Sequence, residues 1–273
     1  MAGDAAADLY LDLLKNCLTR ALVIDEEVRP AGGLGWRGAA FAPVASVLDR
    51  FGIRLGRRGG DAEIRAAGRD WPRHAETMVG LKRLDNVQHC VAQVLRDGVP
   101  GDLIETGVWK GGTTIFMRAA LEAYGDTARS VWVADSFRGL PAPNAVDYPA
   151  DRDLDMRYPE LCIGLEQVKQ NFRRYGLLDD RVRFLEGWFK DTLPSAPIDR
   201  LAVARLDGDL YESTMDAMTA LYPKLSVGGF LIVDDYASID ACRQAVTDYR
   251  RANGIDDPIV AVDWTGVFWR KTA

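Results

Sequence analysis

Apolar and polar residues follow two different spacings along most of this 273-residue chain. Short continuous apolar runs, which are typical of buried strands, alternate with stretches in which apolar residues recur every three or four positions, as along one face of a helix. Strands are predicted at residues 102–108, 131–134, 182–185, 201–206, 230–233, 259–262 and 267–269. Because strands and helices alternate, the pattern predicts a doubly wound α/β fold with a mostly parallel sheet.

The predicted helices fill the intervals between these strands. One covers residues 78–96, and the next opens at the glycine turn Gly111-Gly112. Three later helices are marked by apolar residues at helical spacing, which begin at Leu165, Met215 and Cys242. Only a short connection around Thr265-Gly266 separates the last two strands, so they are expected to form a hairpin that joins one edge of the sheet antiparallel.

The first 75 residues follow a different pattern. A leucine-rich amphipathic helix is predicted near the start, from Leu9, Leu13, Leu14, Leu18 and Leu22. Residues 29–73 are rich in glycine and arginine, which favours loops. We therefore expect residues 1–75 to form an appendage of helix and loops, serving as a solvated cover, an acceptor cover or a dimer contact. Residues 76–273 should form the main domain, with a proline-rich lid insertion at 141–160.

Composition narrows the class of protein. The net charge of -6 and the lack of a basic stripe argue against nucleic acid as a partner. The four cysteines are dispersed and form no CxxC pair, which favours reduced thiols in a cytoplasmic protein. The N-terminus is acidic and does not resemble a signal peptide, and no apolar stretch approaches the roughly 18 residues that span a bilayer.

Acidic residues follow two of the predicted strands directly. Asp207 and Asp209 come after the run 201–206, and Asp234-Asp235 comes after the run 230–233. The carboxyl ends of neighbouring parallel strands meet at the ligand-binding crevice, where gathered carboxylates repel unless a cation neutralises them. Mg²⁺, which prefers oxygen ligands, suits such a cluster. Asp209 has two interpretations: it either caps the following helix or supports a neighbouring metal ligand, or it binds the metal directly.

A glycine-containing loop follows the first strand of the main domain. Its sequence from Glu105 to Gly112 lacks the GxGxxG spacing of dinucleotide sites, and its leading acid suits a ligand with a positive group, such as S-adenosylmethionine (SAM). Asp135 ends the second strand, where a carboxylate can accept both ribose hydroxyls of a nucleoside. Gly187-Trp188 ends the third strand, where the indole could pack on the adenine or simply fill the core.

Four motifs in this order resemble the macrocin O-methyltransferase (TylF-type) family. They are the segments 83–86, 103–112, 206–214 and 225–236. The resemblance covers roughly residues 74 to 271. It implies a Rossmann-like class I SAM methyltransferase that uses SAM and Mg²⁺ to methylate a hydroxyl of a deoxysugar on an antibiotic or another glycosylated natural product. It also implies a homodimer or a higher homo-oligomer.

The resemblance assigns roles by position. It makes Asp207, Asp234 and Asp235 the metal ligands, with Asp207 also receiving the acceptor hydroxyl proton; a metal-bound water is the alternative base. The residues it places at SAM are Thr77, Met78, Glu105, Thr106, Gly107, Asp135 and Ser136. The runner-up activity is phenolic O-methylation of an aminocoumarin-like scaffold.

Two readings from other classes remain less favoured. A nicotinamide-dependent dehydrogenase would use the same fold, but the absent GxGxxG and the additional Asp234-Asp235 pair argue against it. A catalytically silent SAM-binding subunit would have no use for the acidic cluster, since such carboxylates without a metal only destabilise a site.

Overall fold

A computed structural model of the protein describes residues 2–26, 28–30, 56–58 and 61–273. Its main sheet has seven strands in the spatial order β5 (Val182–Glu186), β4 (Val131–Asp135), β3 (Asp102–Thr106), β6 (Leu201–Leu206), β7 (Leu225–Val233), β9 (Val267–Arg270) and β8 (Val260–Ala261). The strands from β5 to β7 pair in parallel, and β9 pairs antiparallel with both β7 and β8. The predicted mostly parallel sheet and its antiparallel edge hairpin are therefore confirmed.

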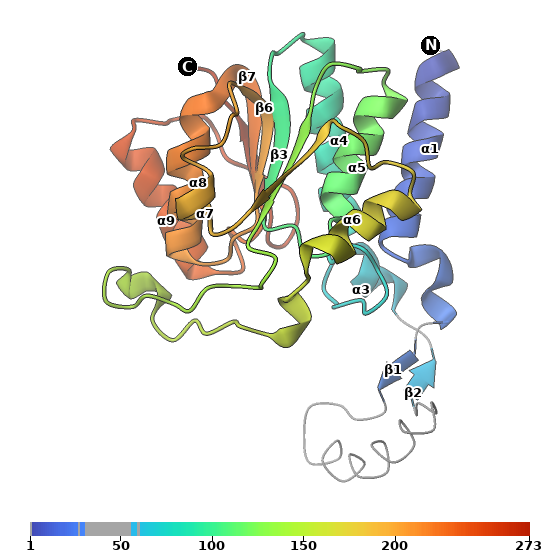
Figure 1. Ribbon diagram of the computed structural model, residues 1–273, viewed down its shortest axis with the longest axis horizontal. Coiled ribbons are helices and arrows are strands. Elements are labelled where there is room, and N and C mark those ends of the chain that lie inside the picture. Colours follow the sequence, from blue (N-terminus) through green and yellow to red (C-terminus); the bar gives the residue numbers. More distant parts are fainter. Residues whose placement is uncertain (1, 27, 31–55, 59–60) are drawn as a thin grey trace.

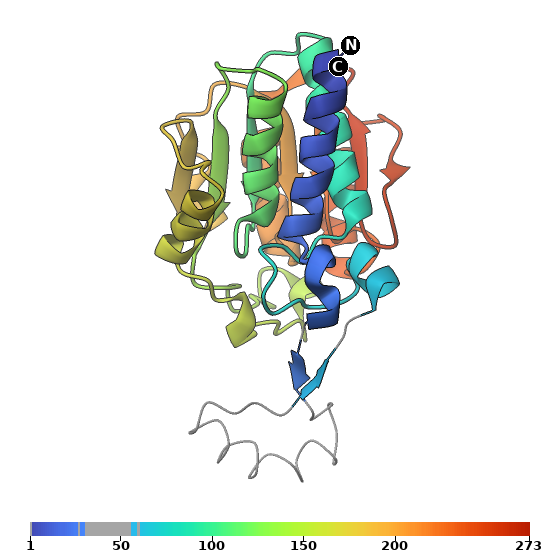
Figure 2. The same ribbon diagram turned by 90° about the vertical axis from the view of Figure 1, so that its right-hand side faces the viewer.

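Helices cover both faces of the sheet (Figures 1 and 2). One face carries α1 (Ala2–Leu18), α4 (Leu81–Arg96), α5 (Gly112–Ala123) and α6 (Leu165–Arg174), and the other carries α7 (Phe189–Thr192), α8 (Tyr211–Leu221) and α9 (Asp240–Ala252). Each face has its own apolar core, since strand residues alternate between the two sides. The helices were predicted close to these bounds, apart from the short α7.

The chain order of the strands reverses between β3 and β6. From β3 the chain moves outward through β4 and β5, then returns to the other side of β3 with β6 and β7. In such sheets the crevice for ligands lies at the carboxyl ends of the two strands at the reversal. The loops after β3 and β6 therefore frame the expected site.

Only some of the leucines expected on the buried face of the first helix pack against the main domain. Leu11, Leu14 and Leu18 are buried in the same core as α4 and α5. Leu9 and Leu13 are instead 73% and 56% exposed, because they lie on the opposite side of the helix. The helix was predicted correctly, but its buried face was only partly correct.

The rest of the N-terminal segment contributes short elements. They are the 3₁₀ turn η1 (Ala21–Glu26), the antiparallel pair β1 (Val28–Pro30) and β2 (Gly56–Arg58), and α3 (Ala62–Ala66). The expectation of loops over 29–73 falls partly on 31–55 and 59–60, which lie outside the described residues. Among the helices that are described, none is long and apolar enough to cross a membrane.

The insertion at 141–160 passes across the carboxyl end of the sheet, at the end of the molecule opposite the start of α1 and the C-terminus (Figure 1). It contains two single 3₁₀ turns, η2 (Pro149–Asp151) and η3 (Pro159–Leu161), and a third, η4 (Tyr222–Lys224), follows α8. Proline starts both turns of the insertion, in agreement with the expectation that the segment forms no longer element.

Candidate functional site

Two adjoining cavities open at the carboxyl ends of β3 and β6. The first encloses about 890 Å³ and the second about 870 Å³ of space not filled by protein atoms, part of which is open to solvent. Their common border is formed by Met78, Gly107, Trp109, Leu161, Asp207 and Asp209. A ligand in one cavity can therefore approach a ligand in the other at this border.

Gly107 permits the close approach of the two strand ends. Its φ is +81°, and a Cβ there would overlap with the carbonyl oxygen of Asp207. The Asp207 amide in turn donates to the carbonyl of Thr106 at 2.9 Å. Glycine at position 107 thus allows the loop after β3 to lie directly against the acidic loop after β6.

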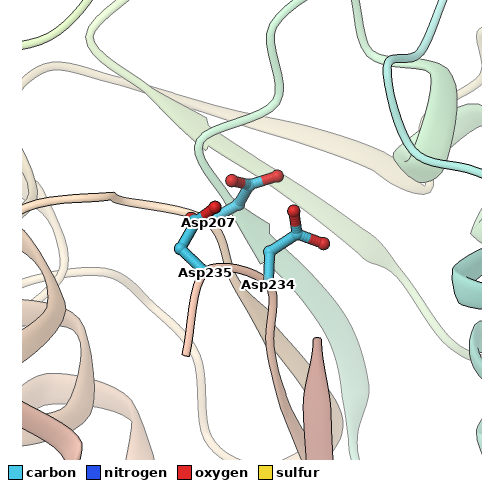
Figure 3. Close-up of side chains that lie close together, drawn as sticks. All are labelled: Asp207, Asp234 and Asp235. Atoms are coloured by element: carbon cyan, nitrogen blue, oxygen red, sulfur yellow. The ribbon is translucent and has the colours of Figure 1, made fainter. Parts of the chain in front are cut away.

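Asp207, Asp234 and Asp235 gather at the end of β6 and β7 (Figure 3). One carboxylate oxygen of each lies within 4.8 Å of the others. Parallel pairing sets this proximity, because Leu206 is opposite Val233 and the chain leaves both strands at the next residue. The sequence-predicted ligand set is therefore brought together in space.

Two buried arginines hold Asp234 in place. Arg83 donates to Oδ2 of Asp234, and Arg205 donates to Oδ1 of the same carboxylate. Arg205 also donates to Asp207 Oδ2 at 2.7 Å and to Glu105 Oε1 at 2.5 Å. One guanidinium thus connects the ends of β3, β6 and β7.

Negative charge exceeds positive charge in this cluster. Burial, followed by the charge of Asp234, raises the pKa of Asp207, although Arg205 opposes the shift. Burial and the neighbouring Asp209 and Asp207 raise the pKa of Asp235 well above its ordinary value. Burial alone would do the same to Asp234, but the charges of Arg205 and Arg83 hold the pKa of that carboxyl below its ordinary value. Asp234, which pairs with both arginines, is therefore the carboxylate that ionises most readily, whereas Asp207 and Asp235 resist ionisation.

The donor set fits a hard divalent cation. Within the described part of the chain, Oδ2 of Asp235 is buried and has no hydrogen-bond partner. A divalent ion at the three carboxylates would supply the missing partner and offset the excess of negative charge. The residues that could hold it are Asp207, Asp234 and Asp235.

The first cavity contains most of the residues expected at the nucleoside. Asp135 lies in its wall, where Oδ2 accepts from the amide of Val108 at 2.8 Å and Oδ1 from that of Phe137 at 2.7 Å. These bonds fix the carboxylate, although its burial raises its pKa. Ser136 and Trp188 line the same cavity, so a carboxylate, a hydroxyl and an aromatic side chain all border it.

Of the other residues predicted to contact SAM, some line the cavities and some lie in the core. Met78 borders both cavities, and Thr77 and Glu105 line the second. Glu105 is fully buried against Arg205, and burial raises its pKa to about 8. Thr106 and Gly187 border neither cavity, although Thr106 bonds β6 through its carbonyl.

Asp209 does not cap the helix that follows it. The first amides of α8 are capped by the lid residue Asp151, which accepts from Tyr211 at 2.6 Å and from Glu212 at 3.0 Å. Asp209 instead has a left-handed backbone, φ +58°, and borders both cavities. The capping interpretation is therefore wrong, because a residue 60 positions away supplies the cap.

Three important residues were missed from the sequence. An arginine within the apolar run 201–206 was the available signal for Arg205, since a buried charge needs partners. Asp151 and Trp264 carried no such signal, because their contacts are with distant segments: α8 for Asp151 and Ala67 for Trp264.

Comparisons with known proteins agree with the sequence resemblance. The sequence model of the macrocin-O-methyltransferase (TylF) family matches residues 7–271. The chain is 58% identical to 8-demethyl-8-(2,3-dimethoxy-alpha-L-rhamnosyl)-tetracenomycin-C 4'-O-methyltransferase of Streptomyces olivaceus over 98% of this chain and 94% of that protein. It is 48% identical to mycinamicin III 3''-O-methyltransferase of Micromonospora griseorubida over the full length of both. Among solved structures, the O-methyltransferase NovP has a TM-score of 0.85 and 45% identity, over 98% of this chain and 100% of that one.

Proposed function

Because the chain belongs to the TylF macrocin O-methyltransferase family and is an O-methyltransferase with SAM as its methyl donor, we propose that it methylates a hydroxyl of a deoxysugar on a glycosylated natural product in a Mg²⁺-dependent reaction. The observation that carries this proposal is the border shared by the two cavities, at which Asp207 faces both.

The first cavity is the proposed SAM site. Asp135 would accept the ribose hydroxyls, and Trp188 would pack against the adenine. Met78 and Gly107 at the border would then contact the amino-acid end, and the sulfonium methyl would face the second cavity. Thr77, Glu105, Thr106, Ser136 and Gly187 are proposed as further or supporting contacts.

Asp207, Asp234 and Asp235 are the proposed ligands of Mg²⁺. The ion would stabilise the negative charge that develops on the acceptor oxygen. The protein supplies the positioning, because Arg83 and Arg205 fix Asp234 while Thr106 at the end of β3 accepts from the Asp207 amide.

Asp207 is the proposed acceptor of the hydroxyl proton, since it belongs to the acidic triad and also borders both cavities. In the reaction the O–H proton leaves, the oxygen–methyl bond forms and the sulfur–methyl bond breaks, which releases S-adenosylhomocysteine. Holding oxygen, carbon and sulfur nearly in line supplies much of the rate.

The names of the relatives support a glycosylated acceptor. One acts on a rhamnosyl tetracenomycin and another on mycinamicin III. We favour a deoxysugar hydroxyl on a polyketide for this chain, with a phenolic hydroxyl of an aminocoumarin-like scaffold as the second candidate.

The test is the mass and position of the product. The purified enzyme is incubated with SAM, Mg²⁺ and both classes of acceptor, and the products are analysed by mass spectrometry and NMR. A gain of one methyl group on the sugar supports the proposal, whereas methylation confined to phenols, or full turnover after EDTA treatment, contradicts it.

We also propose a boundary between the N-terminal appendage and the main domain at residue 75, and self-association of the protein. α1 packs into the core of the main domain, so we propose that the appendage folds together with it. The exposed Leu9 and Leu13 leave an apolar strip on α1 that suits a homodimer contact. Light scattering of the wild-type protein and of Leu9→Glu/Leu13→Glu tests the dimer; an unchanged mass would contradict this contact.

A further inference from the structure

The wall of the second cavity contains a tryptophan to which the proposed reaction assigns no role. Trp264 lies in the β8–β9 connection and lines the cavity together with Asp207, Asp234 and Asp235. It is 41% exposed, although its Nε1 donates to the carbonyl of Ala67 at 2.8 Å. A large apolar ring that is anchored at one end and open to a cavity is typical of a ligand-contacting surface.

The residues on either side of Trp264 tie the ring to the acidic cluster. The preceding residue, Asp263, pairs with Arg83, the arginine that also holds Asp234. The following residue, Thr265, donates from Oγ1 to the carbonyl of Asp234 at 2.8 Å. The position of the indole is therefore fixed relative to the carboxylates at which we propose the acceptor hydroxyl reacts.

Two other groups belong to the same wall. The exposed Arg69 places its guanidinium carbon 5.2 Å from the centroid of the Trp264 ring, within cation–π range. Trp71 also lines the cavity and packs edge-to-face on Tyr158 of the lid, with the ring centroids 5.5 Å apart. The cavity is thus lined by exposed aromatic groups and an exposed hydrogen-bond donor, and by carboxylates that are more deeply buried.

We propose that Trp264 is the stacking surface for the sugar ring of the acceptor and so helps to select which hydroxyl reaches the acidic cluster. This inference rests on the proposed function. One face of a deoxyhexose is made mainly of C–H groups, which match an indole, while its remaining hydroxyls can accept from Arg69 or approach the carboxylates. A ring held against a fixed indole presents only one edge to Asp207, which is what regioselectivity needs.

The experiment compares Trp264→Ala and Trp264→Phe with the wild-type enzyme. Probes are the rhamnosylated tetracenomycin and the mycinamicin III glycoside on which the relatives act. Their binding to protein loaded with S-adenosylhomocysteine and Mg²⁺ is measured by calorimetry, and KM and kcat by product mass. We expect Trp264→Ala to weaken glycoside binding and raise the acceptor KM by roughly tenfold or more, and Trp264→Phe to have a smaller effect.

Trp188→Ala is the matched control, because Trp188 lines the first cavity and not the second. It should weaken SAM binding and, at a concentration of S-adenosylhomocysteine that saturates the variant, leave glycoside binding unchanged, the reverse of Trp264→Ala. A Mg²⁺ titration of each variant reports whether the carboxylates have moved.

Unchanged glycoside binding in Trp264→Ala would overturn the inference. The inference would also be overturned if Trp264→Phe lost as much affinity for Mg²⁺ as for the glycoside, because Trp264 would then only support the structure of the site. If the wild-type enzyme binds glycosides but does not methylate them, the proposed function fails while the binding comparison still decides the role of Trp264. If it neither binds nor methylates them, both fail.

Discussion

Arg205 donates a 2.5 Å hydrogen bond to Oε1 of Glu105, with both side chains fully buried between β6 and β3. The same guanidinium also contacts Asp207 and Asp234. The loop proposed to hold SAM and the carboxylates proposed to hold Mg²⁺ therefore share one internal counter-ion.

Replacing Arg205 tests whether the buried carboxylates depend on it as a counter-ion. Arg205→Met leaves Glu105 and Asp207 without their arginine partner, so we expect a loss of roughly 3–5 kcal/mol in the free energy of unfolding in EDTA, with partial recovery in Mg²⁺. Urea unfolding measures it, and Arg200→Met, at an exposed position, is the control. Adding Glu105→Gln should reduce the loss, because the unpaired charge is removed. Equal losses in Arg205→Met and Arg200→Met would contradict the counter-ion role.

Asp235→Asn tests the metal site. The change removes one carboxylate of the triad, so we expect Mg²⁺ affinity to fall by roughly tenfold or more and kcat to fall by roughly a hundredfold or more. SAM affinity should be unchanged, because Asp235 does not line the first cavity. Calorimetry and steady-state kinetics give both quantities. Asp199→Asn, whose side chain is 99% exposed, is the control; Mg²⁺ binding unaffected by Asp235→Asn would exclude this ligand set.

The carboxyl group of Asp209 makes the free energy of unfolding depend on pH. Burial and the charges of Asp207 and Asp234 raise its pKa to about 8, so from about pH 4 to 8 the folded state binds more protons there than the unfolded state does. This contribution makes metal-free protein less stable as pH rises through that window, with no further change above it.

Asp209→Asn removes the contribution. In EDTA, the Tm of the variant minus that of the wild type should increase between pH 4 and 8, and Mg²⁺ should reduce the difference. Differential scanning fluorimetry over a pH series measures it. A Tm difference that is constant with pH, or that decreases as pH rises, would contradict the shifted pKa.

Asp151 should couple the lid to SAM binding. Asp151→Ala uncaps α8, for which we expect a loss of roughly 0.5–2 kcal/mol in the free energy of unfolding. The first cavity is also lined by Pro141 of the lid segment and by Leu140 and Leu161 at its two ends, so SAM affinity should fall as well.

Calorimetry and limited proteolysis of residues 141–160 test this coupling. Asp153→Ala, two positions along the same lid and exposed, is the control. A lid as resistant to protease in Asp151→Ala as in Asp153→Ala would show that the cap does not hold it.

The fold was predictable because it follows from local patterns. Apolar runs at strand length and apolar residues at helical spacing are present in the sequence whatever the tertiary structure, so β6 was predicted at its observed bounds and the start of α9 within two residues. The buried face of α1 was less predictable, since leucines lie on more than one side of the helix and only contact with α4 and α5 selects Leu11 over Leu9.

The sequence predicted residues of the candidate site only where they directly follow a strand. Asp207, Asp234 and Asp235 end neighbouring strands, and parallel pairing alone brings them together. Asp209 was misread because its sequence position suits a helix cap, whereas the cap comes from Asp151, distant in the chain.

The sequence by itself thus determined the order of strands and helices, the acidic cluster at the end of β6 and β7, and the glycine at position 107 that lets β3 approach them. The tertiary structure decided which groups share the charge of that cluster. Arg83, Arg205 and Trp264 come from α4, β6 and the β8–β9 connection. Only the folded sheet brings them to the same acidic cluster, because contacts between distant segments depend on packing and leave no periodicity in the chain.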